Sequence, residues 1–128
     1  MTSKTIAVIG GGPVGLAAAA HLVGRGVPVK LYEAGAAIGA NLRDWGHVRV
    51  FTPWRFCVDA ASVELLERQG WTLPPADAFP TGGEIARDYL EPLAATPELA
   101  PVIETDVRVT AISRLGIDKV VSHGREER

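Results

Sequence analysis

The fold of this chain is decided by residues 5–15, which read Thr5-Ile6-Ala7-Val8-Ile9-Gly10-Gly11-Gly12-Pro13-Val14-Gly15. A short β-branched apolar run that ends in glycines predicts a fully buried strand of the kind found in parallel sheets. Residues 13–23 predict a helix, because proline suits a first helical position and the glycines at 24 and 26 are typical stop signals. Residues 28–33 predict a second strand. The start of the chain therefore indicates a βαβ unit with a right-handed crossover.

The glycines between the first strand and the helix match a phosphate-binding pattern. Gly10, Gly12 and Gly15 fit G-x-G-x-x-G, and the pattern leaves a strand and opens a helix, as the motif requires. Gly10 allows the tight turn, Gly12 lets a pyrophosphate approach the backbone, and Gly15 allows close packing of helix on strand. The free N–H groups of Val14 and Gly15, together with the dipole of the helix that Pro13 begins, favour an anion. These five residues are predicted to bind a dinucleotide.

An acidic residue completes the pattern. Glu33 follows Gly15 by 18 positions and ends the second predicted strand. A carboxylate there accepts hydrogen bonds from the ribose hydroxyls of an adenosine and repels a 2′-phosphate, which argues against NADP at this site. The alternative is a plain glycine-rich turn beside a solvated glutamate. The order of strand, glycines, helix, strand and acid favours the dinucleotide.

The rest of the chain mixes helices and loops. Asp59 is expected to cap a helix over residues 59–69, and Thr81 with Glu84 forms a capping box before another helix. Pro92 is expected to kink or end that second helix. Irregular structure is predicted for residues 34–59, with an extended piece at 48–51, and for the proline-rich connection 71–80.

Short strands are predicted near the C-terminus. Alternating apolar and polar residues there suggest antiparallel pairing with one exposed face. The predicted strands are residues 102–105, 108–114 and 119–121.

Length and composition exclude several classes of protein. The 128 residues, with a mass of 13.6 kDa, predict one domain over residues 1–128. A net charge of −2 leaves no basic excess for nucleic acid. The longest apolar run, residues 6–20, is too short and too rich in glycine to span a membrane, and no secretory signal is evident, so a cytoplasmic location is expected.

No metal site and no catalytic residue is predicted. The single cysteine, Cys57, excludes an internal disulfide and a cysteine-cluster metal site. The three histidines share no spacing typical of metal ligands. No residue is assigned as catalytic.

Three segments resemble the FAD-binding start of flavoprotein oxidoreductases with two dinucleotide-binding domains, such as thioredoxin-reductase-like enzymes and flavin-containing monooxygenases. They are residues 6–16, 31–34 and 38–43. The resemblance implies an α/β, Rossmann-like FAD-binding domain with a parallel sheet core and a small antiparallel β excursion.

The resemblance also implies further contacts with FAD. Ala34 follows the acidic residue of the ribose site. Gly39 and Arg43 match a segment that wraps FAD in the family, although Ala40 replaces its second glycine. Val109 matches a strand residue whose main chain touches the adenine.

Other parts of the family are missing from the sequence. No closing Ala-Thr-Gly strand, second G-x-G-x-x-G or C-x-x-C is found. We therefore expect an incomplete domain that self-associates or is completed by a partner chain. The resemblance implies that in the complete protein NAD(P)H reduces the flavin of a reductase or monooxygenase. Two alternatives remain: an NAD-binding module of a dehydrogenase or nucleotide sensor, and a catalytically silent fragment that needs a partner chain.

Overall fold

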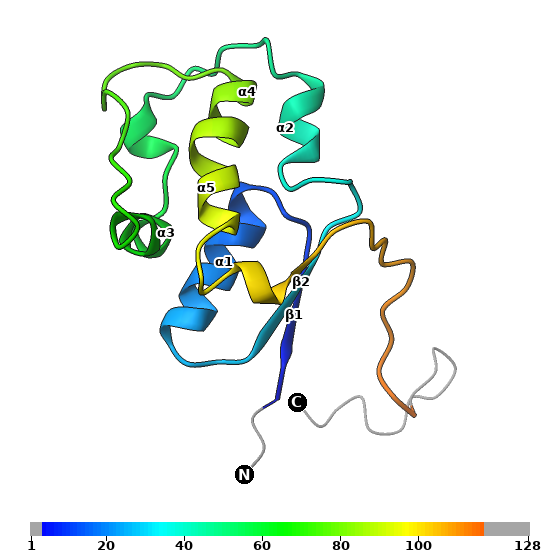
Figure 1. Ribbon diagram of the computed structural model, residues 1–128. Coiled ribbons are helices and arrows are strands. Elements are labelled where there is room, and N and C mark those ends of the chain that lie inside the picture. The colour runs from blue at the N-terminus through cyan, green and yellow to red at the C-terminus, as the bar shows by residue number, and fades with distance from the viewer. Residues whose placement is uncertain (1–3, 117–128) are drawn as a thin grey trace, which may run out of the picture.

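The computed structural model describes residues 4–116, which form an α/β arrangement around a three-stranded parallel sheet. In spatial order, the strands are β1 (Ile6–Ile9), β2 (Val29–Tyr32) and β3 (Ile103–Glu104). Helix α1 (Pro13–Gly24) connects the first two strands, which confirms the predicted βαβ unit (Figure 1). Because Ile9 pairs with Tyr32, β1 and β2 end at the same edge of the sheet.

The hydrophobic core lies between the sheet and the helices on one of its sides. In β2, Val29 and Leu31 are buried while Lys30 between them is exposed, the pattern of a strand with one covered face. Helix α1 packs on this covered face, and α3 (Ala60–Glu67) packs on α1 (Figure 1). The leucines with no exposed surface at the centre of the core are Leu16, Leu31, Leu90, Leu93 and Leu99.

Helix α1 starts unusually close to the turn that precedes it. A Cβ atom at position 15 would lie 1.8 Å from the carbonyl oxygen of Gly10, so only glycine fits there. Gly10 has φ +102°, a conformation that side chains disfavour. The close helix packing predicted for Gly15 is therefore present, and it sets the position of the helix N-terminus relative to the end of β1.

Strand β1 is more exposed than its sequence predicts. Its apolar residues Ile6 and Ile9 keep 43% and 51% of their surface exposed, so the prediction of a fully buried strand was wrong. Within residues 4–116, β1 is an edge strand that pairs only with β2. An apolar run encodes a buried strand only if other elements cover both faces, and the described residues supply one layer.

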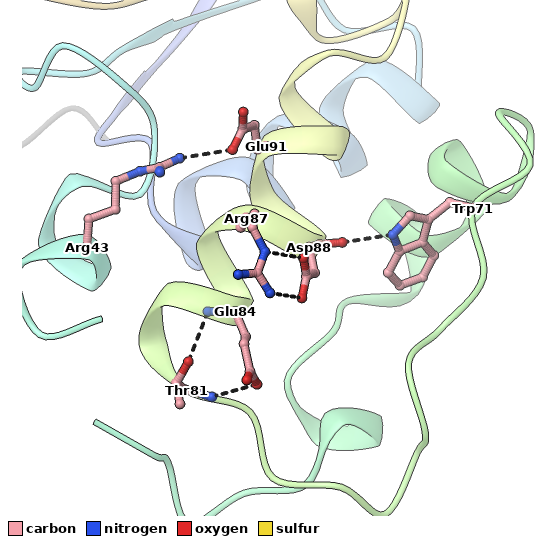
Figure 2. A network of polar contacts seen from close by, with 7 residues as sticks. All are labelled: Arg43, Trp71, Thr81, Glu84, Arg87, Asp88 and Glu91. Carbon is pink, nitrogen blue, oxygen red and sulfur yellow. Dashed lines mark hydrogen bonds and ion pairs between the residues drawn. The ribbon is translucent and has the colours of Figure 1, made fainter. Parts of the chain in front are cut away.

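A continuous helical segment runs from residue 82 to residue 94. It comprises α4 (Gly82–Ile85), the π-helical turn η2 (Ala86–Leu90) and α5 (Glu91–Ala94). The predicted capping box is confirmed: the Glu84 N–H donates to Thr81 Oγ1, and the Thr81 N–H donates to Glu84 Oε2, both at 3.1 Å (Figure 2).

Pro92 does not end this helix, because the π turn accommodates it. The N–H of Glu91 donates to the carbonyl of Ala86, five residues back. Proline has no N–H to donate to the carbonyl of Asp88, four residues before it. The indole N–H of Trp71 donates to that carbonyl instead, at 2.9 Å (Figure 2). A side chain from a distant loop thus satisfies the acceptor that Pro92 leaves free.

The region predicted as irregular, residues 34–59, contains two short helices. They are α2 (Ala40–Asp44) and the 3₁₀ turn η1 (Trp54–Phe56). The extended piece predicted at 48–51 is reduced to a single antiparallel bridge between Arg49 and Thr81. Helices this short lack a clear periodic pattern, which explains why the sequence did not reveal them.

The predicted C-terminal strands need correction. Residues 103–104 do form a strand, β3, but it pairs parallel to β2 rather than antiparallel. The predicted strand 108–114 is absent, because residues 108–113 form no strand and Arg114 forms a single isolated bridge. The predicted strand 119–121 lies outside the described residues. After β3 the N–H groups of Asp106 and Val107 donate to the carbonyls of Gly35 and Glu33, at 2.9 and 3.0 Å. These bonds hold the segment against the loop that follows β2 rather than in a hairpin.

Asp59 joins three helical elements at one point. Its Oδ2 accepts the Ser62 N–H at 3.0 Å and caps α3 as predicted, while its Oδ1 lies 2.9 Å from Nε2 of His21 on α1. Its own N–H donates to the hydroxyl of Tyr89 on η2, at 3.0 Å. Burial raises the pKa of the Asp59 carboxyl, but hydrogen bonds from His21 and Ser62 outweigh burial and lower the pKa overall.

We predict that Asp59→Ala lowers the free energy of unfolding by about 1–2 kcal/mol at neutral pH, because it removes the helix cap. The folded-state pKa of Asp59 lies below its ordinary value of 3.8, so the ionised carboxylate stabilises the fold above pH 3.8. This contribution is lost as the pH falls through the lowered pKa. Urea unfolding measures both effects. Asp59→Asn, which keeps an acceptor without the charge, is the control, and a wild-type advantage over it that persists in strong acid contradicts the charge contribution.

We predict that Gly15→Ala destabilises the fold by about 3 kcal/mol or more, because the added methyl overlaps a backbone oxygen that cannot move aside cheaply. Gly24→Ala at the other end of α1 is the matched control. Its Cβ meets nothing within 4 Å, so we expect it to be neutral or stabilising by about 0.5–1 kcal/mol. Thermal unfolding compares the two variants, and equal stability would refute the close packing at Gly15.

Candidate dinucleotide-binding site

The glycine-rich turn leaves the N-terminus of α1 open. Gly12 is the N-cap residue of this 12-residue helix, and a Cβ there would meet no atom within 4 Å. No side chain caps the helix, and its first turn contains no acidic residue. The N–H groups of Val14 and Gly15 belong to that first turn, and N–H groups there have no backbone acceptor within the helix. Backbone donors and the positive end of the helix dipole therefore form an accessible place for an anion.

The Glu33 side chain ties this turn to the loop that follows β2. Its Oε1 accepts the N–H of Gly11 at 2.9 Å, and its Oε2 accepts the N–H of Gly35 at 2.6 Å. A carboxylate offers about four acceptor positions, so about two remain for an incoming hydroxyl pair. The residue predicted to bind a ribose is thus present at the edge where β1 and β2 end, and the protein itself fixes its orientation.

Two hollows meet at this edge of the sheet, and both are lined by Gly10, Glu33, Ala40 and Asn41. One hollow, of about 380 Å³, extends toward the segment after β3 and is named the β3-side pocket. The other, of about 280 Å³, extends over the start of α1 toward α2 and is named the α2-side pocket. Together the two pockets are named the trough, and Gly10 of the glycine turn and Glu33 are common to both.

Most of the predicted cofactor-binding residues line these pockets. Ala34 and Val109 lie in the β3-side pocket, and Gly12 and Pro13 lie in the α2-side pocket. Val14 lines neither pocket, and its side chain is 83% exposed. Its contribution to binding therefore rests on its backbone N–H.

Arg43 is not brought together with the other predicted residues. It lines neither pocket. Its Nε donates to the carbonyl of Ile38 at 3.2 Å, and its Nη2 donates to Oε2 of Glu91 on α5 at 3.4 Å (Figure 2). The guanidinium thus faces the helical layer and not the trough.

Sequence reasoning did not assign several residues that line the pockets, Asn41, Trp45 and Arg108 among them. Asn41 lines both pockets, Trp45 lines the α2-side pocket, and Arg108 lines the β3-side pocket. The position of Asn41, two residues after Gly39 in the matched segment, is a signal that points to it. For Trp45 and Arg108 the sequence carries no comparable signal, because their places depend on how loops fold back on the sheet.

Other chemistry is not evident in the described part of the chain. Residues 4–116 contain no group of three or more His, Cys, Asp or Glu side chains placed to hold a metal ion. Burial raises the pKa of the Cys57 thiol, and its Sγ lies 3.4 Å from the carbonyl of Thr52, so the thiol is not activated as a nucleophile. Among the same residues, no helix is long and apolar enough to cross a membrane.

Comparisons with known proteins agree with this geometry. A family model described as FAD dependent oxidoreductase matches residues 5–116. An oxidized steroid monooxygenase bound to NADP is 29% identical with a TM-score of 0.65, and the match covers 86% of this chain and 20% of that one.

OTEMO in complex with FAD and NADP gives the same TM-score and the same coverage at 22% identity, and this likeness shows the fold alone. No curated protein matches the chain. The chain spans 20% of the length of both solved structures. The match over residues 5–116 shows that the chain belongs to the FAD-dependent oxidoreductase family, whose Rossmann-like FAD-binding fold it shares.

Proposed function

We propose that the chain binds FAD in an extended form along the trough, as the FAD-binding part of a flavoprotein oxidoreductase. The observation that carries this proposal is the meeting of two pockets at Gly10 and Glu33, beside the open N-terminus of α1. A ribose acceptor and a phosphate-binding turn must lie next to each other to hold an adenosine diphosphate. Membership of an FAD-dependent family supports FAD as the ligand.

The residues would divide the cofactor between them. The β3-side pocket, with Ala34 and Val109, takes the adenosine, and the free acceptor positions of Glu33 take its ribose hydroxyls. The pyrophosphate lies over Gly12 and accepts from the N–H groups of Val14 and Gly15. The α2-side pocket then takes the part of the cofactor beyond the pyrophosphate.

Bound flavin supplies hydride and oxygen chemistry, while the chain binds and orients it. We propose that NAD(P)H is the electron donor of the whole protein and that the whole protein is a reductase or monooxygenase. The negative charge of Glu33 disfavours the 2′-phosphate of NADP in the trough, so an NADP donor would bind outside the trough. No residue of the described chain is proposed as catalytic.

The assembly around the chain is also a proposal. The 43% and 51% exposure of Ile6 and Ile9 on the edge strand β1 supports completion by a partner chain or self-association. We propose that residues 1–128 form one domain. We also propose a cytoplasmic location. An NAD-binding module remains the second candidate, because the glycine turn and Glu33 suit any adenine dinucleotide.

The first test is the absorbance spectrum of the purified protein, before and after FAD is added and the sample is desalted. We expect retained bands of oxidised flavin. A colourless protein that binds NAD in calorimetry would overturn the FAD proposal in favour of the NAD-binding module.

We predict that Glu33→Gln weakens FAD binding by about ten- to a hundredfold, because it removes charged hydrogen bonds worth about 1.5–3 kcal/mol. Isothermal titration calorimetry measures the affinity. Glu104→Gln is the matched control, since Glu104 ends β3, pairs with Lys30 at 3.8 Å and lines neither pocket. Unchanged affinity in Glu33→Gln would refute the ribose role.

A further inference from the structure

The wall between the two pockets is a short segment that cannot hold its own shape. Residues 38–42 contain Ala40 and Asn41, which line both pockets. Helix α2, to which they belong, has only five residues, and helices this short are not stable by themselves in water. The wall must therefore be held by contacts with the rest of the fold.

The wall is joined directly to the phosphate-binding turn. The N–H of Gly39 donates to the carbonyl of Gly11 at 2.8 Å. The side chain of Ile38 is buried, and a Cβ at Gly11 would lie 3.0 Å from its Cγ2. A displacement of the wall would therefore also displace the glycine turn, over which we propose that the pyrophosphate lies.

Arg43 contacts the wall without lining either pocket. Its Nε donates to the carbonyl of Ile38 at the start of the wall, and its Nη2 donates to Glu91 at 3.4 Å (Figure 2). The N–H of Arg43 also donates to the carbonyl of Gly39, at 3.1 Å. The bonds to Ile38 and Gly39 both end at the start of the wall, and the guanidinium links that start to Glu91 on α5.

The helical segment that carries Glu91 is capped and well packed. The helical segment 82–94 is capped by Thr81 and Glu84, and Trp71 holds its π turn (Figure 2). It buries Tyr89 and Leu90, and a Cβ at Gly39 would lie 3.2 Å from Cδ1 of Leu90. Glu91 therefore belongs to a well-packed helix, and the wall packs against that helix at Gly39.

We propose that Arg43 is a positioning residue for the dinucleotide site, acting through the Ile38 carbonyl and Glu91 to hold residues 38–42 against the glycine turn. It does not contact the ligand. The ligand part of this inference rests on the proposed function, whereas the support of the wall does not. A direct contact between Arg43 and a phosphate is the competing role, and the two roles predict opposite effects of removing Glu91.

The test measures the binding of FAD, ADP and adenosine by calorimetry to the wild type, Arg43→Ala and Glu91→Gln. We expect both variants to weaken all three ligands by about two- to fivefold, the range for a partly exposed ion pair. The loss is equal for adenosine and ADP, because the wall borders both pockets. The charge-reversed pair Arg43→Glu with Glu91→Arg regains part of the affinity that each single reversal loses.

Two controls match the changes in charge. Arg87→Ala removes an exposed arginine whose guanidinium donates to its neighbour Asp88, and Glu64→Gln removes a glutamate of α3 that pairs with Arg68. Both should bind the ligands like the wild type. The proposal is overturned if Arg43→Ala weakens ADP but not adenosine, or if Glu91→Gln tightens binding by freeing the arginine.

Amide hydrogen exchange without ligand separates this inference from the proposed function. If the wild type binds none of the three ligands, the proposed function fails. The positioning role is then decided by the Gly39 amide, which should exchange faster in Arg43→Ala and Glu91→Gln than in the two controls. Equal protection of this amide in all variants refutes the positioning role.

Discussion

The carboxylate and peptide groups of Glu33 form the junction on which the rest of the site depends. The side chain accepts the N–H of Gly11 in the glycine turn and the N–H of Gly35 in the loop after β2. Its backbone N–H donates to the Glu104 carbonyl at 2.8 Å, and its carbonyl accepts the Val107 N–H at 3.0 Å. The glycine turn, the loop after β2 and the exit from β3 are thus tied to one residue. Loss of its charge would weaken the bonds to the glycine turn and to the loop after β2, while the backbone bonds to the exit from β3 would remain.

Local patterns predicted the parts of the fold that local interactions determine. The cap at Asp59 and the box of Thr81 and Glu84 depend on residues within a few positions of one another. The strands and the helix of the βαβ unit also follow from local patterns, although the pairing of its two strands joins residues farther apart. The tight packing at Gly15 was also predictable, because the glycine pattern has a known physical purpose. In the candidate site, the same pattern located the turn and the acid.

Contacts between distant residues explain what the sequence did not reveal. The parallel pairing of β3 depends on where the helical layer returns the chain to the sheet, and alternation of residues cannot distinguish this from a hairpin. The helix passes Pro92 because Trp71, 17 residues before Asp88, supplies the missing donor. Arg43 matched a family segment, yet its guanidinium faces Glu91, a partner 48 residues away. In each case the partner lies far away in the sequence, where a local pattern does not reveal it.

The placement of the three tryptophans gives the molecule separate optical reporters. Trp54 is 3% exposed and belongs to the core, so its emission follows global unfolding. Trp71 is fixed by its hydrogen bond and lies 6.1 Å, centroid to centroid, from Tyr89, which makes its near-ultraviolet dichroism sensitive to the packing of the π turn. Trp45 is 38% exposed and lines the α2-side pocket, where an isoalloxazine or ribityl group would quench it or shield it from water. Single-tryptophan versions of the chain therefore resolve core, helix and pocket as three spectroscopic signals.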